Sequence, residues 1–198
     1  MIEVYKFEGI NEEECRVKCL DSLDVYNNEI IVKEIEENDK YVMEVLKKED
    51  IKKYIEDYLN KLSKKMNIDF NINIYEEDNV FLVRMNSKNN SILIGKDGKT
   101  LNSIQFLLRK AISCLTGFNI NVNLDVSNYK QKIEKRFENE IKKVINEVLK
   151  TKIETKLDPM NSYKRRIVHS IASNYYNIET NSVGEEPNRC TIIRYVEK

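Results

Sequence analysis

The chain has 198 residues, of which 41% are hydrophobic and 33% are charged, so it can bury cores and is not a disordered polymer. Its apolar runs are too short to span a bilayer, and its N-terminus lacks a basic start followed by an apolar stretch, so we expect a cytoplasmic protein. The net charge of zero hides an asymmetry. Residues 1–50 carry 7 Lys and Arg against 15 Asp and Glu, whereas residues 51–198 carry 26 against 18. We expect the basic part to meet polyanions, with ordinary solvated surface as the alternative.

Two features of the sequence argue against a metal site and against catalysis. The cysteines are scattered, at Cys15, Cys19, Cys114 and Cys190, and the chain has one histidine. A structural zinc site needs closely spaced pairs of ligands, so we expect reduced thiols, no metal and no cofactor. The sequence also lacks a Gly-x-x-x-x-Gly-Lys-Ser/Thr phosphate loop and a Gly-x-Ser-x-Gly nucleophile motif, so we expect no enzyme.

The first fifty residues predict a strand, a helix and two further strands. Asn11 and Glu14 have the spacing of a capping box, which favours a helix that begins there. Residues 29–36 and 40–46 are rich in β-forming residues and meet at Asn38-Asp39, which predicts a hairpin. We assign residues 1–49 to a small β-α-β-β module.

Residues 50–126 predict a helix, two strands, a short apolar segment, a long helix and a last strand. The first helix begins near Asp50, and Asp78-Asn79 predicts the turn between the two strands. The long helix ends near Gly117. We expect it to direct the following side chains inward: Leu101, Ile104, Leu108, Ile112 and Leu115.

Residues 127–198 predict two helices and a strand after a turn. A charged helix opens at Ser127, and Asp158-Pro159 predicts the N-cap and first residue of the next helix. The charged helix has an apolar stripe of Ile133, Phe137, Ile141, Val144, Val148 and Leu149. The pair Tyr175-Tyr176 has two interpretations, a stacking platform for bases or one core ring beside one exposed ring, and we prefer the second.

The segment Gly95-Lys96-Asp97-Gly98 lies between an apolar segment that ends at Ile94 and the start of the long helix. Two glycines three positions apart let the backbone turn sharply and approach a ligand, and a helix start presents unpaired amides and the positive end of the dipole. With charge from Lys96 and Lys99, the segment suits a sugar-phosphate backbone. A plain helix-capping turn is the alternative.

In this order of elements, α-β-β-α-α-β, the segment resembles the type II K-homology (KH) domain. The resemblance implies that the Gly-x-x-Gly loop clamps about four nucleotides of single-stranded RNA, with the bases in an apolar groove beside it. Asp97 places a negative charge where phosphate passes, and we expect it to weaken binding. The residues expected to bind RNA are Ile94, Gly95, Lys96, Asp97, Gly98 and Lys99.

A second candidate site lies in the predicted helix after Pro159. Arg165 and His169 are four positions apart, so a helix places them on one face. An arginine binds phosphate through paired hydrogen bonds, and an imidazole stacks on a base or donates to a phosphate. For His169 the alternative is a partly buried structural histidine.

Residues 158–169 resemble the domain named for its Arg-x-x-x-His signature, the R-3-H domain. Residues 184–189 resemble the loop before the last strand of that domain, which supplies a further basic contact, and Glu186 stands where a glycine is common. The resemblance implies a small α/β domain that binds RNA through Arg165, Arg166, His169 and Arg189.

The two domains, joined by a charged helix and preceded by the N-terminal module, together resemble the Jag (SpoIIIJ-associated) family of Gram-positive bacteria. The expected fold is therefore α/β (α+β) in three modules, 1–49, 50–126 and 127–198. The resemblance implies a non-catalytic RNA-binding regulator linked to cell elongation, envelope synthesis and sporulation.

Several partners are expected on this interpretation. They are single-stranded RNA, with single-stranded DNA as an alternative ligand, a small single-KH protein, a second copy of the chain, and indirectly a YidC-type membrane insertase. The rival hypothesis is a protein adaptor, in which the acidic N-terminal module and the KH groove dock other proteins and RNA binding is vestigial.

Overall fold

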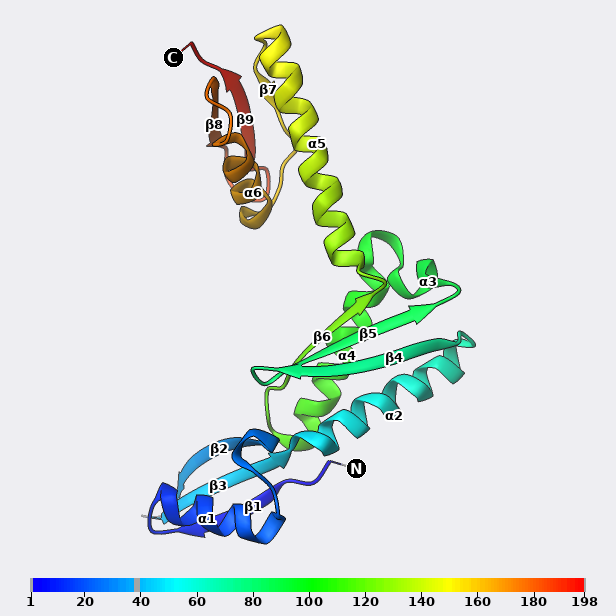
Figure 1. Cartoon of the computed structure of the whole chain (residues 1–198), viewed down its shortest axis with the longest axis vertical. Coiled ribbons are helices and arrows are strands. Elements are labelled where there is room, and N and C mark those ends of the chain that lie inside the picture. Colours follow the sequence, from blue (N-terminus) through cyan, green and yellow to red (C-terminus); the bar gives the residue numbers. More distant parts are fainter. Residues whose placement is uncertain (1, 38–39, 198) are drawn as a thin grey trace. The chain divides into compact units, whose positions relative to one another are not determined.

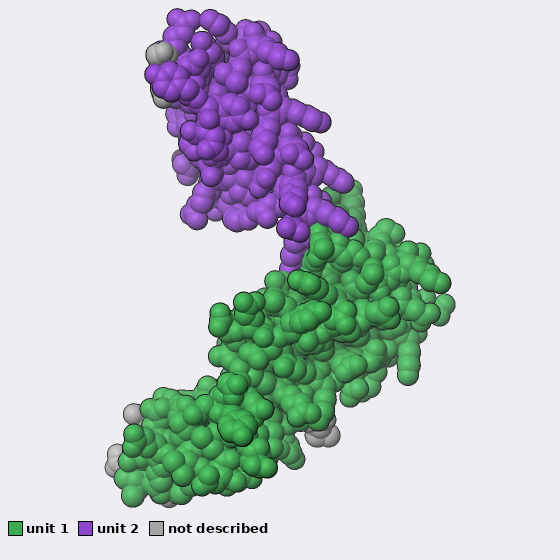
Figure 2. All heavy atoms as spheres, viewed as in Figure 1, with its two compact units in different colours: residues 1–129 green, residues 130–198 purple. Residues whose placement is uncertain are grey.

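The computed structural model describes residues 2–37 and 40–197, which form two compact units, residues 1–129 and residues 130–198 (Figure 2). The described strands form three sheets of three strands each (Figure 1). This arrangement confirms the predicted α+β class built from three small modules. The predicted hairpin turn at Asn38-Asp39 lies outside the described residues.

The N-terminal module is one antiparallel sheet, in the order β1-β3-β2, with a helix packed on it. Its elements are β1 (Tyr5–Gly9), α1 (Glu12–Leu23), the short η1 (Asn27–Glu29), β2 (Ile30–Glu37) and β3 (Lys40–Lys47). Asn11 caps α1 as predicted, because its Oδ1 accepts the Glu14 amide at 2.9 Å. Cys15 and Cys19 lie on the buried side of α1, beside Met43 and Val45 of β3.

The KH-type module follows directly on β3. Its elements are α2 (Lys48–Met66), β4 (Phe70–Glu77), β5 (Val80–Ser87), α3 (Asn90–Ile94), the short η2 (Lys96–Gly98), α4 (Lys99–Thr116) and β6 (Asn121–Val126). Strand β5 pairs antiparallel with β4 and parallel with β6, because the intervening helices carry the chain back across the sheet. Asp78 and Asn79 both adopt positive φ in the predicted turn between β4 and β5.

The core of the KH-type module extends into the N-terminal module. Ile2 and Leu46 are buried in it, and Ile31 packs against it. The buried Lys48 pairs with Glu76 at 2.9 Å, and this hydrogen bond holds the pKa of Glu76 below its usual value of 4.5. The apolar contacts of Ile2, Ile31 and Leu46 explain why residues 1–129 form one unit.

The predicted set of inward-facing residues on α4 is wrong at Leu115. Leu115 is 55% exposed, whereas Thr116 is buried. The buried positions advance by three and then by four residues at a time, so after Ile112 the next inward position is 116. The hydroxyl of Thr116 donates to the Ile112 carbonyl at 2.8 Å, which satisfies it inside the core.

The second unit packs one long helix and one short helix with a sheet in the order β7-β9-β8. Its elements are α5 (Tyr129–Thr151), β7 (Thr155–Lys156), α6 (Ser162–Ala172), β8 (Ile178–Val183) and β9 (Cys190–Tyr195). The core includes Ile141, Ile145 and Val148 of α5. Ile133, the first member of the predicted apolar stripe, is 38% exposed.

The predicted start of the second helix at Asp158-Pro159 is wrong. Asn161 is the N-cap, and its side chain accepts the Lys164 amide at 3.0 Å. The preceding residues stay extended because the Leu157 amide donates to the Thr191 carbonyl and the Met160 amide to the Arg189 carbonyl, so this stretch follows β9.

Tyr175 packs against the core and Tyr176 is 74% exposed, which confirms the preferred interpretation of that pair. Among the described helices, none is both long and apolar enough to cross a membrane.

Candidate nucleic-acid interface

The Gly-x-x-Gly segment, residues 95–98 and hereafter the KH loop, connects α3 to α4. The Gly95 amide donates to the Ser91 carbonyl at 2.8 Å, which ends α3. Gly95 has φ 71° and ψ −176°, a conformation that is essentially confined to glycine. Asp97 and Gly98 then adopt left-handed conformations before α4 begins at Lys99. The sharp turn that the sequence predicted is therefore present, and its two glycines produce it.

Neighbouring side chains also leave little room for a Cβ at either end of the KH loop. A Cβ on Gly95 would lie 2.1 Å from Thr100 Oγ1, and a Cβ on Gly98 would lie 3.0 Å from Tyr129 Cε1. Gly98 is buried, and the partly buried Tyr129 belongs to the same unit as the loop. Tyr129 is a contact that the sequence analysis missed, since only the fold brings the first residue of α5 to a loop 31 positions earlier.

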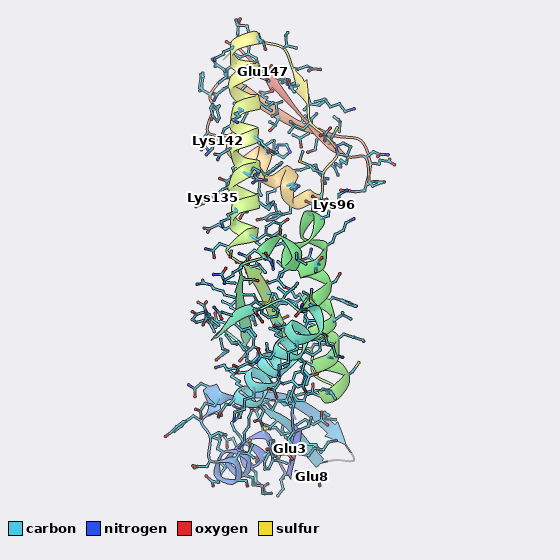
Figure 3. All side chains as sticks on the ribbon, turned by 90° about the vertical axis from the view of Figure 1, so that its right-hand side faces the viewer. Glu3, Glu8, Lys96, Lys135, Lys142 and Glu147 are labelled. Atoms are coloured by element: carbon cyan, nitrogen blue, oxygen red, sulfur yellow. The ribbon has the colours of Figure 1, made fainter. Side chains whose placement is uncertain are left out.

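The KH loop presents charge to solvent at the start of an 18-residue helix. Lys96, Asp97 and Lys99 are exposed, and Figure 3 marks Lys96 on the loop, while Ile94 packs against the KH core. Gly98 is the N-cap of α4, and because glycine has no side chain, no side-chain hydrogen bond caps the positive end of this helix. This arrangement can hold an anion such as a phosphate group.

In the second unit, Arg165 is buried and already paired. Only 9% of its side chain is exposed, and its Nη1 donates to the Met160 carbonyl at 2.6 Å and to Glu186 Oε1 at 2.8 Å. Glu186 comes from the loop between β8 and β9, and its own side chain is 60% exposed. The guanidinium therefore lies in an anion site that a carboxylate of the same chain occupies.

His169 lies on the same helix as Arg165 but faces the neighbouring strand. Its Nδ1 lies 2.7 Å from Thr180 Oγ1 and its Nε2 lies 2.9 Å from Ser182 Oγ, both on β8. Each ring nitrogen thus has a hydroxyl partner, and the imidazole is half-buried. This geometry supports the structural interpretation of His169, because the ring links α6 to β8.

Arg166 and Arg189 are the exposed members of the predicted R-3-H set. Arg166 lies on α6, and Arg189 directly precedes β9, where its carbonyl accepts the Met160 amide at 3.1 Å. The fold thus brings the two chain segments of the R-3-H set together in the second unit, while the KH loop belongs to the first unit.

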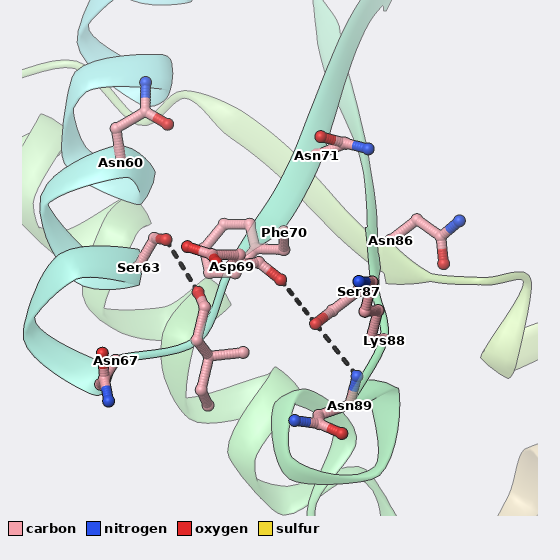
Figure 4. Close-up of a pocket in the computed structure, with 11 residues that line it drawn as sticks. Asn60, Ser63, Asn67, Asp69, Phe70, Asn71, Asn86, Ser87, Lys88 and Asn89 are labelled. Atoms are coloured by element: carbon pink, nitrogen blue, oxygen red, sulfur yellow. Dashed lines mark hydrogen bonds between the residues drawn. The ribbon is translucent and has the colours of Figure 1, made fainter.

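A polar hollow of about 760 Å³ lies in the KH-type module, between the end of α2 and the adjoining ends of β4 and β5 (Figure 4). Ser63 donates to the Ile68 carbonyl and Ser87 to the Asp69 carbonyl at its floor. The other lining residues are Asn60, Asn67, Phe70, Asn71, Asn86, Lys88 and Asn89. None of the residues predicted from the sequence to bind RNA lines this hollow.

Comparisons with known proteins match both modules. The R-3-H domain family matches residues 131–195, and the KH domain family of KhpA and KhpB matches residues 52–124. The chain is 29% identical over 154 residues to the RNA-binding protein KhpB of Clostridium symbiosum, covering 77% of this chain and 69% of that protein. It is 29% identical over 199 aligned positions to KhpB of Bacillus subtilis, covering 94% and 96%. It is 26% identical over 137 residues to KhpB of Lactiplantibacillus plantarum, covering 69% and 42%.

These relatives carry the name of an RNA-binding protein, in agreement with the prediction that the chain is not an enzyme. The two domain families together account for most of the chain, and the similarity to the Bacillus subtilis protein runs over nearly its whole length. The chain therefore belongs to the KhpB (Jag) family, in which a KH domain is combined with an R-3-H domain.

Proposed function

We propose that the chain binds single-stranded RNA and that the KH loop holds the sugar-phosphate backbone. The observation that carries this proposal is the loop itself: a Gly-x-x-Gly turn with two exposed lysines at the uncapped start of α4. The positive end of the α4 dipole attracts phosphate, and Lys96 and Lys99 add two positive charges. The names of the relatives, which are RNA-binding proteins, support the same function.

The carboxylate of Asp97 weakens the binding of phosphate at this site. Its carboxylate is exposed within the KH loop, next to the proposed path of the phosphates. Its φ of 54° lies in the left-handed region, which asparagine tolerates as well as aspartate does. Asp97→Asn therefore removes the repulsive charge without straining the loop, and we expect it to tighten RNA binding.

In the R-3-H domain, Arg166 and Arg189 are the proposed direct contacts, because both are exposed. Arg165 would take part only when Glu186 leaves its guanidinium and a phosphate replaces the carboxylate. His169 contributes through the position of α6 against β8, since both ring nitrogens already have partners.

The proposal is tested by RNA-binding titrations of charge variants. Lys96→Asp should weaken binding strongly. The control Lys110→Asp makes the same charge change at an exposed lysine of α4, about 17 Å along the helix axis from Lys99, and should have little effect. With at least four phosphate contacts, log affinity should fall with log salt with a slope of about −3 or steeper, at about 0.7 per contact. Equal affinities of the two variants, both folded by circular dichroism, would exclude the loop as the RNA site.

A protein contact is a second candidate function, and one surface favours it. On α4, the adjacent Phe106 and Leu107 are 66% and 55% exposed, which is unusual for two large apolar side chains next to each other on a helix. We propose that this surface docks another KH domain, either that of a small single-KH protein or that of a second copy. Leu107→Glu should abolish such association in sedimentation experiments and leave the fold intact. An unchanged mass of the complex would exclude this surface.

The biological setting is proposed from the family resemblance. The chain would act in the cytoplasm as a non-catalytic regulator of transcripts for cell elongation, envelope synthesis or sporulation. A census of RNA crosslinked to the protein in cells tests this setting. Crosslinks spread evenly over all transcripts would contradict a regulatory role directed at such genes.

A further inference from the structure

The side of α5 that is turned away from the core of the second unit carries a concentrated positive charge. At about 100° per residue, six cations fall within about 120° of the helix circumference. Together with two asparagines they form the outer face of α5: Lys132, Lys135, Arg136, Asn139, Lys142, Lys143, Asn146 and Lys150. All eight side chains are exposed, and Figure 3 shows Lys135 and Lys142 on the side away from α6 and the strands. From the first to the last, the face extends over about 27 Å, at about 1.5 Å per residue.

This segregation of charge differs from that of an ordinary solvated helix. The whole chain has 33 basic and 33 acidic residues, yet the outer face of α5 contains no acidic residue. Solvated helices usually pair opposite charges four positions apart. Here Lys132 and Arg136 repeat the same charge at that spacing. Glu140, Glu138 and Glu147 do lie four positions from Arg136, Lys142 and Lys143, but they lie outside the face, and none of the six cations forms an ion pair with another described residue. The cations of this face therefore repel one another, and the binding of a polyanion would relieve this repulsion.

We propose that the outer face of α5 is a further binding surface for the phosphate backbone of RNA. The inference rests on the proposed RNA-binding function and adds the outer face of α5 to the KH loop and the R-3-H residues as a contact for the RNA backbone. Six cations along 27 Å match a linear polyanion in sign and in shape. The two asparagines, within the same face, can bond to sugars and bases without adding charge.

An anionic membrane surface is the competing polyanion, and the structure argues against it. Helices that lie on membranes insert an apolar face into the lipid. The apolar face of α5 is buried in its own domain, where Ile141, Ile145 and Val148 are at most 3% exposed. The outer face itself contains no apolar side chain. Charge without an inserting face suits nucleic acid better than lipid.

The test removes three charges from this face of the full-length protein. The variant carries Lys135→Gln, Lys142→Gln and Lys143→Gln, since glutamine is a good helix former and preserves α5. The matched control carries Lys61→Gln, Lys64→Gln and Lys65→Gln, which removes three exposed charges from α2. The probes are single-stranded RNAs of about 6 nucleotides, enough for the KH loop, and about 24 nucleotides. Binding is measured across a range of salt concentrations.

We expect the α5 variant to lose salt dependence and affinity for the long strand only. Three lost contacts lower the slope by about 2, which corresponds to about a hundredfold weaker binding at 0.1 M salt. The affinity of the α5 variant for the short strand and the affinities of the α2 control should change little.

If the α5 variant binds the long strand as the wild type does, the inference is wrong while the proposed function stands. If the wild type binds neither strand, the proposed function itself fails, and the inference with it. If vesicles of phosphatidylglycerol bind the wild type but not the α5 variant, and RNA binding is unchanged, the face is a membrane surface and the inference is overturned.

Discussion

Gly98 and Gly117 form a matched pair that isolates the contact between the KH loop and Tyr129. Both glycines lie next to the ends of α4 and have nearly the same left-handed conformation, φ 78° and ψ 10° against φ 72° and ψ 6°. A Cβ on Gly117 would meet nothing within 4 Å, whereas a Cβ on Gly98 would lie 3.0 Å from Tyr129 Cε1. Alanine at either position therefore imposes the same backbone strain, and only Gly98→Ala also presses on a ring.

The expected losses of stability follow from these geometries. Gly117→Ala should lower the free energy of unfolding by about 1–2 kcal/mol, the cost of a left-handed alanine. Gly98→Ala should lower it by about 2–5 kcal/mol, because overpacking adds about 1–3 kcal/mol to the same strain. Gly98→Ala should also weaken RNA binding, since the ring and the loop must move apart, whereas Gly117→Ala should leave it unchanged.

Urea denaturation of the full chain, followed by circular dichroism, measures both losses. Tyr129→Leu removes the ring atom that clashes, so in a double-mutant cycle Gly98→Ala should cost less in the leucine background by about 1 kcal/mol or more. Equal destabilisation by Gly98→Ala and Gly117→Ala, together with no coupling in the cycle, would refute the argument. Tyr129 would then be free to yield, and glycine at position 98 would be required by the backbone alone.

Three further predictions concern other parts of the chain. Glu186→Gln should tighten RNA binding, because a neutral amide holds the Arg165 guanidinium less strongly than a carboxylate does, so a phosphate can replace it more easily. Glu185→Gln, which removes the same charge from an exposed neighbour, should have a smaller effect; equal gains would indicate only long-range repulsion. The lowered pKa of Glu76 means that its ion pair stabilises the fold above about pH 4.5 and is lost as the pH falls through the folded-state pKa. Glu76→Gln should therefore flatten the acid limb of stability measured by denaturation, and a limb as steep as that of the wild type would contradict this assignment. Iodoacetamide should modify the exposed Cys114 first, because burial protects the other three thiols and raises the pKa of Cys15 and Cys19. Mass spectrometry measures the order of labelling, and early labelling of Cys15 would show that α1 opens readily.

The elements that the sequence predicted correctly depend on local patterns. The Asn11 cap, the turn at Asp78-Asn79, and the Gly95 and Gly98 pair each rest on backbone preferences that act within a few residues. The order of helices and strands in the KH-type module follows from hydrophobic periodicity, which is also local. The family resemblance rested on these same short motifs, and the comparisons confirm it.

The errors arose where a distant segment competes with a local preference. Asp158-Pro159 has the pattern of a helix start, but hydrogen bonds to Thr191 and Arg189 keep this stretch extended beside β9. Leu115 belongs to an apolar stripe in sequence, but the core of the KH-type module takes Thr116 instead. Local propensity is worth less than tertiary hydrogen bonds and burial, so the structure overrides it.

The state of each candidate binding residue was decided by the tertiary structure alone. The spacing of Arg165 and His169 on one helix was readable from the sequence, but their partners were not. Glu186 reaches Arg165 across 21 positions, and Thr180 and Ser182 reach His169 from β8, because strand pairing carries these side chains to α6. The apolar stripe of α5 was also readable from the sequence, and the packing of Ile141, Ile145 and Val148 in the core shows that the opposite side, which carries the cations, faces solvent. Periodicity is a property of one segment, whereas exposure depends on what the rest of the chain packs against it.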